Sequence, residues 1–298
     1  PGQSDGRLRF DESMARMTTF RVGGPADAVL LPSGPDEVAT AIRLCRANHI
    51  PVTILGNGSN VVVSDAGIRG LVIVFGQPYA QFEIKEEGNS LYSIRAGAGA
   101  LLSGVATRCA AAGLTGMEFA CGIPGSVGGA VFMNAGAYDG CMADVVTETR
   151  VMESALTPHT IGASEHRFGY RTSALMGNGA IILETRLLLR QGDPERIQAR
   201  IAELGARRRQ SQPLEWPSAG SVFKRPAGYY AGKLIADSGL RGLRVGGAQV
   251  SEKHAGFIVN TGGASATDIR ILADRVAVAV LEHTGVPLET EIRFIGDW

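Results

Sequence analysis

Apolar residues recur at helical spacing in several parts of the chain. In Pro35–His49, a proline stands near the start, Asp36 and Glu37 occupy the first turn, and apolar residues follow on one face, which is typical of a helix. In Thr267–His283, residues 269, 272, 276 and 280 are all apolar and form one stripe. The same reasoning predicts helices over Leu101–Ala112, Pro194–Arg209 and Tyr230–Ser238.

Short β-branched runs between these segments predict strands. They lie at Val52–Leu55, Val61–Val63, Leu71–Phe75, Leu91–Ala96, Val145–Met152, Ile181–Arg190, Ala248–Val250, Phe257–Asn260 and Leu288–Ile295. We expect Val145–Met152 and Ile181–Arg190 to share one sheet. The segment Gln210–Pro217 is polar and contains proline, so it is a plausible boundary between two lobes joined by the helix Pro194–Arg209. The class is α+β, with a larger lobe followed by a smaller one.

The overall composition is that of a soluble globular protein with room for about two domains. The chain has 298 residues, 45% hydrophobic, with 29 basic and 29 acidic side chains and zero formal net charge. The basic run Arg207–Arg209 ends a helical pattern, where we expect a solvated helix terminus rather than a nucleic-acid contact. No apolar run reaches the ~18 residues that a membrane span needs. The start, Pro1–Asp5, has neither an initiator Met nor a signal-peptide pattern, so we expect a trimmed or engineered terminus.

The cysteines and histidines show no spacing typical of a disulfide framework or a metal site. The cysteines, 45, 109, 121 and 141, are widely separated and form no C-x-x-C pair. The five histidines also lack metal-ligand spacing. We therefore expect a reduced, cytoplasmic protein without a structural metal.

Two glycine-rich elements carry the first functional signal. Ala120–Gly140 is rich in glycine and other small residues and is nearly uncharged, and Gly56–Asn60 is a turn between two β-branched runs. Glycine leaves main-chain N–H groups uncovered, so such elements suit a long ligand that carries phosphates. A plain hairpin turn remains an alternative for Gly56–Asn60. Neither element matches G-x-G-x-x-G, so a Rossmann fold is not implied.

Three polar residues occupy positions that could serve chemistry. Ser221 follows Gly220, Arg171 follows Tyr170 in an aromatic-rich turn, and Glu291 lies in the predicted strand Leu288–Ile295, on the side opposite its apolar residues. Each also has an ordinary structural interpretation as a turn, surface or solvent-facing residue. Nothing in the residues alone brings the three together.

Nine motifs, in order and in spacing, resemble the UDP-N-acetylenolpyruvoylglucosamine reductases, flavoenzymes of peptidoglycan precursor synthesis. The resemblance covers the chain from about Thr18 to Gly296. The motifs are Thr18–Ala26, Gly56–Asn60, Gly122–Ala130, Asn134–Gly136, Tyr170–Arg171, Ala219–Lys224, Ala231–Ile235, Gln249–His254 and Leu288–Glu291. Any one of them is weak, but nine in register are specific.

The resemblance implies a lobe of the vanillyl-alcohol-oxidase (PCMH) type that binds FAD non-covalently, followed by a smaller α+β substrate lobe. The implied boundaries are 1–75 and 76–209 for two FAD-binding subdomains, 210–287 for the substrate domain and 288–298 for a terminal strand carrying Glu291. The implied reaction uses NADPH to reduce FAD and then reduces the enolpyruvyl ether of UDP-N-acetylglucosamine-enolpyruvate to UDP-N-acetylmuramate. No nucleic acid or membrane is implied as a partner, and we expect a monomer.

By motif position, the resemblance implies a proton donor, Ser221, and two partners of the substrate carboxylate, Arg171 and Glu291. The implied FAD-binding residues are Arg21, Gly23, Gly24, Gly56, Asn57, Gly58, Ser59, Asn60, Gly122, Ile123, Pro124, Gly125, Ser126, Gly128, Gly129, Ala130, Asn134 and Gly136. The implied nucleotide-sugar residues are Tyr170, Lys224, Arg225, Lys233 and Gln249.

The implied chemistry explains these residue types. Hydride addition to the vinyl ether places negative charge on the α-carbon and the carboxylate, which a planar guanidinium can stabilise. A nearby glutamate helps only when it is protonated, as burial beside negative charge favours. The hydroxyl of Ser221 can then protonate the α-carbon, with Lys224 a candidate neighbour.

The chain departs from the family pattern at two places. Arg225 stands where some relatives carry asparagine. The passage from Arg171 to the strand at Ile181 is too short for the extra tyrosine-bearing loop that covers the substrate in some relatives, so this chain resembles the shorter type.

Two other functions are compatible with parts of the sequence. An FAD oxidase acting on an alcohol or lactone would share the first lobe, but such enzymes commonly attach flavin through His or Cys, and neither glycine element contains histidine. A non-catalytic nucleotide-sugar sensor would not need Ser221, Arg171 and Glu291 to be intact.

Overall fold

A computed structural model describes residues 7–298, so the predicted trimmed terminus at Pro1–Asp5 lies outside the described residues. The chain divides into two compact units. The first contains residues 1–9, 29–57 and 71–208, and the second contains residues 10–28, 58–70 and 209–298. The chain passes from one unit to the other within three strands, β1 (Leu8–Ser13), β2 (Pro25–Leu30) and β5 (Ile68–Val74). These strands and β3 (Val52–Leu55) form a sheet of order β1-β2-β5-β3.

A six-stranded antiparallel sheet is the framework of the first unit. Its order is β12-β11-β13-β7-β6, and the short β8 (Leu114–Thr115) also pairs with β13. The strands are β6 (Phe82–Gly88), β7 (Leu91–Gly97), β11 (Val146–Met152), β12 (Pro158–Gly162) and β13 (Ile181–Gln191). The prediction that Val145–Met152 and Ile181–Arg190 share a sheet is confirmed, because β11 pairs with β13 from Val146 opposite Leu187 to Met152 opposite Ile181.

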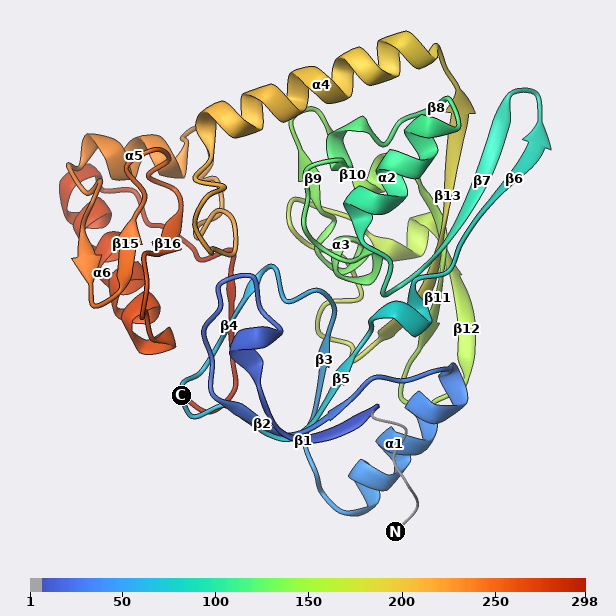
Figure 1. Cartoon of the computed structure of the whole chain (residues 1–298), viewed down its shortest axis with the longest axis horizontal. Helices are drawn as coiled ribbons and strands as arrows, with labels where there is room; N and C mark the ends of the chain where they lie inside the picture. The colour runs from blue at the N-terminus through green and yellow to red at the C-terminus, as the bar shows by residue number, and fades with distance from the viewer. Residues whose placement is uncertain (1–6) are drawn as a thin grey trace. The chain divides into compact units, whose positions relative to one another are not determined.

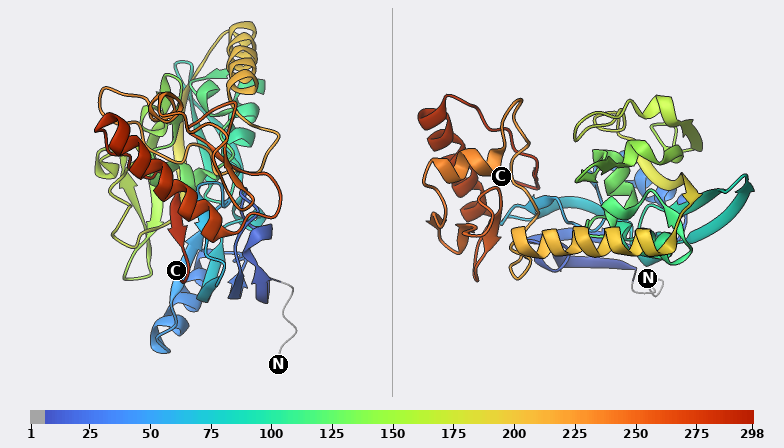
Figure 2. Two further views of the ribbon diagram at one scale, coloured as in Figure 1. Left: turned by 90° about the vertical axis from the view of Figure 1, so that its left-hand side faces the viewer. Right: turned by 90° about the horizontal axis from the view of Figure 1, so that it is seen from above.

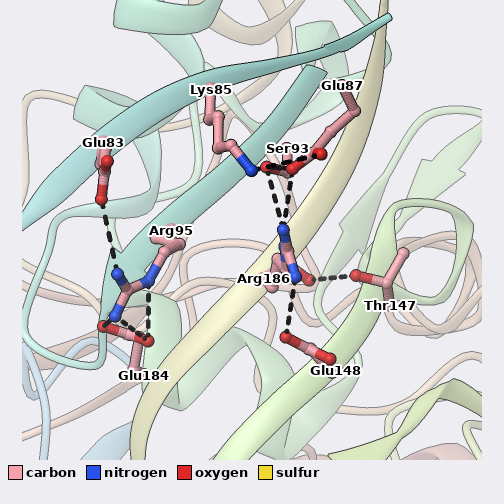
Figure 3. Close-up of polar contacts among 9 residues, drawn as sticks. All are labelled: Glu83, Lys85, Glu87, Ser93, Arg95, Thr147, Glu148, Glu184 and Arg186. Carbon is pink, nitrogen blue, oxygen red and sulfur yellow. Dashed lines mark hydrogen bonds and ion pairs between the residues drawn. The ribbon is translucent and has the colours of Figure 1, made fainter. Parts of the chain in front are cut away.

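The two faces of this sheet differ in polarity. Helix α3 (Val127–Met133) packs against β13 and β7, and α2 (Leu102–Ala111) packs against β8 and the turn that follows it (Figure 1). Side chains at alternate positions point the other way and carry charge, as expected where one face of an antiparallel sheet meets water. Arg95 forms a forked contact with Glu184 at 3.0–3.2 Å, and Arg186 contacts Glu87 at 2.8 Å and Glu148 at 3.3 Å (Figure 3).

This charged network crosses four neighbouring strands, β6, β7, β13 and β11. Glu83 lies opposite Arg95, Arg95 opposite Arg186, and Arg186 opposite Glu148 in the strand register. The two facing Glu–Arg pairs stabilise the sheet. Arg95 and Arg186 face each other with like charge, and the Glu184 and Glu87 carboxylates that contact them offset this repulsion. The network is therefore a structural feature of the exposed face, and no motif of the family resemblance falls on it.

The remaining elements of the first unit connect these layers. They are α1 (Pro35–Ala47), α4 (Pro194–Ser211), whose residues up to 208 belong to this unit, and the two-stranded pair β9 (Gly136–Ala137) and β10 (Gly140–Cys141). Short 3-10 turns lie at Gln77–Tyr79, Glu118–Ala120, Met142–Asp144 and Ala163–His166. Helix α4 is one uninterrupted helix (Figure 2), and the chain enters the second unit near its carboxyl end.

The second unit packs two helices against a small sheet. Strands β14 (Arg244–Val245), β15 (Ala248–Val250) and β16 (Ile258–Asn260) form an antiparallel sheet, on which the long helix α6 (Ala266–Thr284) lies (Figure 1). The short helix α5 (Ala231–Asp237) contacts α6. A 3-10 turn lies at Met14–Arg16, and β4 (Val61–Val63) pairs in parallel with β17 (Arg293–Ile295).

One predicted element is wrong in extent. The terminal strand was expected over Leu288–Ile295, but β17 begins only at Arg293. The preceding residues instead run beside the segment that carries Ser221, with a bridge between Phe223 and Thr290. Glu291 therefore precedes the strand, and its orientation is set by that pairing rather than by strand alternation.

Candidate functional site

The Gly56–Asn60 turn does not close a hairpin. Strand β3 before it pairs in parallel with β5, whereas β4 after it pairs in parallel with β17, so the hairpin alternative is wrong. Gly58 has φ +60°, and a Cβ there would lie 2.0 Å from the carbonyl oxygen of Met17. Within residues 7–298, the four successive amides of Gly56 to Ser59 have no hydrogen-bond acceptor. A turn of uncovered amides is well suited to an anion.

The second glycine element is built differently. Ser126 caps the amino end of α3 and accepts a hydrogen bond from the Gly129 amide at 3.3 Å. The Val127 and Gly128 amides donate to the carbonyls of Ala100 and Ala98 at 2.8 and 2.9 Å. The first-turn amides that a helix usually leaves free are therefore already used here. A Cβ at Gly128 would lie 3.0 Å from that of Ala98, so this glycine serves close packing.

The two glycine elements lie against each other. The Asn57 side-chain amide donates to the carbonyl oxygen of Pro124. A Cβ at Gly56 would lie 2.2 Å from the hydroxyl oxygen of Ser126. The structure thus brings together the two predicted cofactor-binding segments, at the carboxyl end of β3 and the amino end of α3, which the sequence alone did not show.

The remaining predicted residues at the amino end lie beside β4. Arg21 adopts a left-handed φ of +57°. Gly23 has φ +122°, and a Cβ there would lie 2.7 Å from the Cβ of Val63. The Gly24 amide donates to the Ser64 carbonyl at 2.8 Å. These contacts hold the Thr18–Ala26 segment against the strand that follows the Gly56–Asn60 turn.

The turn that carries Tyr170 and Arg171 is anchored on the end of α3. Asn134, in a left-handed conformation, donates from its side-chain amide to the Gly169 carbonyl at 2.9 Å. The Ser173 hydroxyl donates to the Phe132 carbonyl at 2.7 Å, and the Arg171 guanidinium donates to the Gly136 carbonyl at 3.1 Å. The predicted residues Asn134, Gly136 and Arg171 are therefore neighbours.

The sequence did not indicate that His166 supports this turn. His166 is fully buried, and its ring stacks on Phe168 with centroids 4.8 Å apart. Its Nδ1 lies 2.9 Å from the Gly162 carbonyl oxygen and its Nε2 lies 2.8 Å from the Thr149 hydroxyl. Burial lowers the pKa of His166 despite the opposing carbonyl contacts. A neutral ring with hydrogen on Nδ1 satisfies both contacts.

In the second unit, the structure brings Ser221 and Glu291 into one small network. The Glu291 amide donates to the Val222 carbonyl at 2.7 Å, and the Val222 amide donates to the Gly256 carbonyl at 2.9 Å. Ser221 itself forms a bridge with Phe257. The side-chain amide of Asn60 donates to the Glu291 carbonyl at 3.1 Å. Ser221, Glu291 and Asn60 were predicted from separate motifs, and the structure places them next to one another: Asn60 bonds to the main chain of Glu291, which bonds to the residue after Ser221.

The predicted nucleotide-sugar residues of this unit carry local partners. Lys224 forms an ion pair with Glu289, and Lys233 forms one with Asp237 at 2.6 Å. The Arg225 guanidinium lies 3.9 Å from the centroid of the Tyr230 ring. Gln249 accepts a hydrogen bond from Arg244 at 2.9 Å. Both lysines are thus paired with a neighbouring carboxylate.

The predicted residues divide between the units. Arg171 and Tyr170 belong to the first unit, whereas Ser221, Lys224, Arg225, Lys233, Gln249 and Glu291 belong to the second. Within the first unit, a hollow of about 260 Å³ is lined by Gly116, Glu118, Phe119, Tyr138, Asp139, Gly140, Asp144, Arg200 and Leu204. Its three carboxylates against one guanidinium make it a poor site for phosphates.

The prediction of a solvated helix terminus at Arg207–Arg209 is confirmed only in part. Arg207 and Arg209 are exposed, but Arg208 is partly buried and its side chain packs on Gly122. In residues 7–298 no helix is long and apolar enough to span a membrane. The same residues contain no cluster of His, Cys, Asp and Glu side chains that could hold a metal ion.

Comparisons with known proteins match both parts of the chain. Residues 26–156 match the FAD binding domain family, and residues 212–295 match the family described as "UDP-N-acetylenolpyruvoylglucosamine reductase, C-terminal domain". The UDP-N-acetylenolpyruvoylglucosamine reductase of Clostridium perfringens (strain SM101 / Type A) is 48% identical over 289 residues, which cover 97% of this chain and 93% of that protein. The enzyme of the same name from Agathobacter rectalis is 48% identical over 298 residues, covering 98% and 95%.

A solved structure agrees over nearly the whole chain. The crystal structure of the UDP-N-acetylenolpyruvylglucosamine reductase from Thermus caldophilus superposes with a TM-score of 0.83 at 38% sequence identity. The match covers 96% of this chain and 99% of that one.

Proposed function

The chain belongs to the family of UDP-N-acetylenolpyruvoylglucosamine reductases, and from this premise we propose how its residues carry out the reaction. It is an FAD-dependent oxidoreductase that reduces the enolpyruvyl ether of UDP-N-acetylglucosamine-enolpyruvate, in the synthesis of peptidoglycan precursors. The observation that supports this most strongly is 48% identity over 97% of the chain. In our proposal NADPH is the reductant and UDP-N-acetylmuramate is the product.

The residues present fit a flavin dinucleotide. The uncovered amides of Gly56 to Ser59 can bind phosphate oxygens, and the absence of a side chain at Gly56 lets the Ser126 hydroxyl lie close to that turn. We assign FAD binding to this turn, to Arg21, Gly23 and Gly24, to Asn60, to the Gly122–Ala130 segment, and to Asn134 and Gly136. When it is bound, FAD supplies the hydride that adds to the β-carbon of the vinyl ether.

Ser221 is proposed as the proton donor to the α-carbon, with Glu291 beside it. The support is the network in which the Glu291 amide donates to Val222, the residue after Ser221, at 2.7 Å. This arrangement fixes the backbone at both residues, so that their side chains are oriented before the substrate binds. Orientation in advance is what lets a weak acid or a hydrogen-bond donor act on a developing negative charge.

Arg171 is proposed to bind the carboxylate of the enolpyruvyl group. Its left-handed backbone, φ +54°, is held by the Asn134 and Ser173 contacts described above. A planar guanidinium matches a carboxylate with two parallel hydrogen bonds. We further assign the nucleotide-sugar moiety to Tyr170, Lys224, Arg225, Lys233 and Gln249, with Glu289 and Asp237 giving way to the diphosphate.

The remaining assignments are also proposals. The functional division is 1–75 and 76–209 for FAD, 210–287 for the substrate and 288–298 for the segment carrying Glu291. We propose a cytoplasmic monomer that binds neither nucleic acid nor membrane and serves cell-wall synthesis during growth and division.

The proposed roles are tested by separating the two half-reactions. The purified protein is expected to show a flavin absorption spectrum that NADPH bleaches and that the enolpyruvyl sugar restores under anaerobic conditions. In Ser221→Ala, bleaching should proceed almost unchanged, whereas restoration by the sugar should slow by roughly 10²–10⁴-fold, the usual contribution of a positioned general acid. Stopped-flow absorbance measures both rates.

Ser218→Ala is the matched control, because in the described part of the chain only the main-chain carbonyl of Ser218 has a hydrogen-bond partner, the Thr19 hydroxyl. It should leave both rates near those of the unmodified protein. Equal rates of restoration in Ser221→Ala and Ser218→Ala would remove Ser221 from the mechanism. A colourless protein that takes up no flavin would overturn the proposal as a whole.

A further inference from the structure

Arg208, near the carboxyl end of α4, is paired with no carboxylate in the described part of the chain. Its side chain lies against the main chain of Gly122, where a Cβ would be 2.7 Å from Nη1 and 2.9 Å from Cδ. In residues 7–298 its guanidinium makes no hydrogen bond to any acceptor and no ion pair with any carboxylate. The residue is nevertheless partly buried.

Other arginines of α4 differ in this respect. Arg200 contacts Asp139 at 3.3 Å and Glu203 at 2.8 Å, and Arg207 contacts Glu203 at 2.6 Å. Burial lowers the pKa of Arg208, because a desolvated cation is disfavoured, and the neighbouring Tyr138 offsets this only in part. Removing a charge from water without pairing it is costly, so such a residue calls for a counter-ion that the protein chain does not supply.

The surroundings of Arg208 indicate what that counter-ion is. The amides of Gly122, Gly125 and Ser126 have no acceptor in the described part of the chain, so the same loop offers further donors. The carboxylates of the nearby hollow are already engaged. Glu118 accepts hydrogen bonds from Thr115 and Gly116, Asp144 accepts one from the Cys141 amide, and Asp139 pairs with Arg200.

We propose that Arg208 binds an anionic group of the bound flavin dinucleotide, and that Gly122 is a glycine because any side chain there would displace the guanidinium. The inference rests on the proposed FAD site and adds to it a residue from outside both glycine elements. Two groups of the cofactor share the required chemistry. One is the diphosphate, and the other is the N1–O2 edge of the isoalloxazine ring, which becomes negative when the ring is reduced. A guanidinium fork can bind either with two hydrogen bonds.

The test compares Arg208→Gln and Arg208→Lys with Arg207→Gln, which removes an equal charge from the preceding residue of the same helix. Two quantities are measured: the dissociation constant for FAD, by quenching of flavin fluorescence on titration into apoprotein, and the midpoint potential of the bound flavin, by dye-equilibrated reduction. Neither requires turnover. The unmodified protein is first tested for FAD binding and for reduction of the enolpyruvyl sugar. A failure of the proposed function is then distinguished from a failure of the proposal about Arg208.

Contact with the diphosphate predicts that Arg208→Gln weakens FAD binding by roughly ten- to a hundredfold, with an unchanged potential. Contact with the ring edge predicts a more negative potential, because the reduced anion loses its cation. Arg208→Lys should recover part of either effect, and Arg207→Gln should show neither. If Arg208→Gln changes neither quantity, or changes only the KM for the nucleotide sugar, the proposal is overturned.

Discussion

At the scale of single residues, the left-handed backbone of Arg171 shows how the fold holds a functional side chain. A non-glycine residue with φ near +54° is sterically disfavoured, so the surrounding contacts must hold it there. Asn134 and Ser173 fix the turn on one side, and the buried ring of His166 stacked on Phe168 fixes it on the other. The position of the Arg171 guanidinium thus depends on the packing of a buried histidine beside the turn.

The neutral state of His166 predicts a pH dependence of stability. Because burial lowers its pKa below the ordinary value of about 6.5, the folded protein binds the proton less readily than the unfolded chain. The stabilisation is fully present above about pH 6.5 and is lost as the pH falls toward the lowered pKa. Each such histidine gives a slope of at most about 1.4 kcal/mol per pH unit. His254, whose pKa burial also lowers, should add to it.

Urea unfolding at pH 7.0, 6.0 and 5.5 measures this dependence. In His166→Gln the protein should be less stable at every pH, but the fall between pH 7.0 and 5.5 should be smaller. His159→Gln, which alters an exposed histidine, should keep the full fall. An undiminished fall in His166→Gln would show that this ring does not titrate as described.

At the scale of elements, helix α6 is fastened at its amino end by a residue from far away in the sequence. The Asp65 carboxylate accepts hydrogen bonds from the Ala266 and Thr267 amides at 2.8 Å each and from the Thr267 hydroxyl at 2.7 Å. Ser265 and Asp268 add a reciprocal capping box. Burial by itself would raise the pKa of Asp65, but the contacts from Thr267 and Ala266 outweigh it and lower that pKa.

We expect Asp65→Asn to destabilise the protein by about 0.5–2 kcal/mol at pH 7, because the amide must turn a donor toward the donors at the helix end and water competes at this exposed cap. The contribution of Asp65 is present above its unfolded pKa near 3.9 and is lost as the pH falls through the lower folded value. The loss in the variant should therefore shrink below about pH 4. Asp274→Asn is the control, since Asp274 is exposed on the same helix and its carboxylate makes no hydrogen bond within residues 7–298. Chemical denaturation of both variants decides between a cap and a mere change of charge.

At the scale of the whole molecule, the second unit is assembled from three separate stretches of chain. Its hydrophobic core contains Phe20, Val22 and Val62, all nearly inaccessible to solvent, beside the side chains of α5, α6 and β15. Strand β17 pairs with β4, which also comes from the amino-terminal part. The carboxyl-terminal segment that the family comparison matches is therefore incomplete as a folding unit.

A polypeptide of residues 209–298 alone should accordingly fail to fold cooperatively. It lacks the core side chains of Phe20, Val22 and Val62, and deleting one large buried side chain alone typically costs about 3–5 kcal/mol, a large part of a domain's total stability. Near-ultraviolet circular dichroism and urea titration would show this as weak signals and a broad transition, compared with the full chain. A sharp transition of the fragment would contradict this account of the core.

The sequence alone determined the local elements and the family. Helix Pro35–His49 and strand Val52–Leu55 were recognised to within two residues, because helical and alternating patterns report directly which face of a segment is buried. Glycines, prolines and polar residues in nine ordered motifs were enough to indicate the flavoenzyme family and FAD, which the comparisons confirmed.

Only the tertiary structure decided which segments meet. β3 and β4 belong to different sheets, the residues before β17 pair with the Ser221 segment, and Arg208 is partly buried within a run that looks solvated. Each outcome depends on contacts between residues far apart in the chain, where a segment's pattern says that it is buried but not by what. A residue's neighbours in space follow from packing and cannot be read from local periodicity. This is why the sequence showed neither that Arg208 has no carboxylate beside it nor that His166 supports the turn of Arg171.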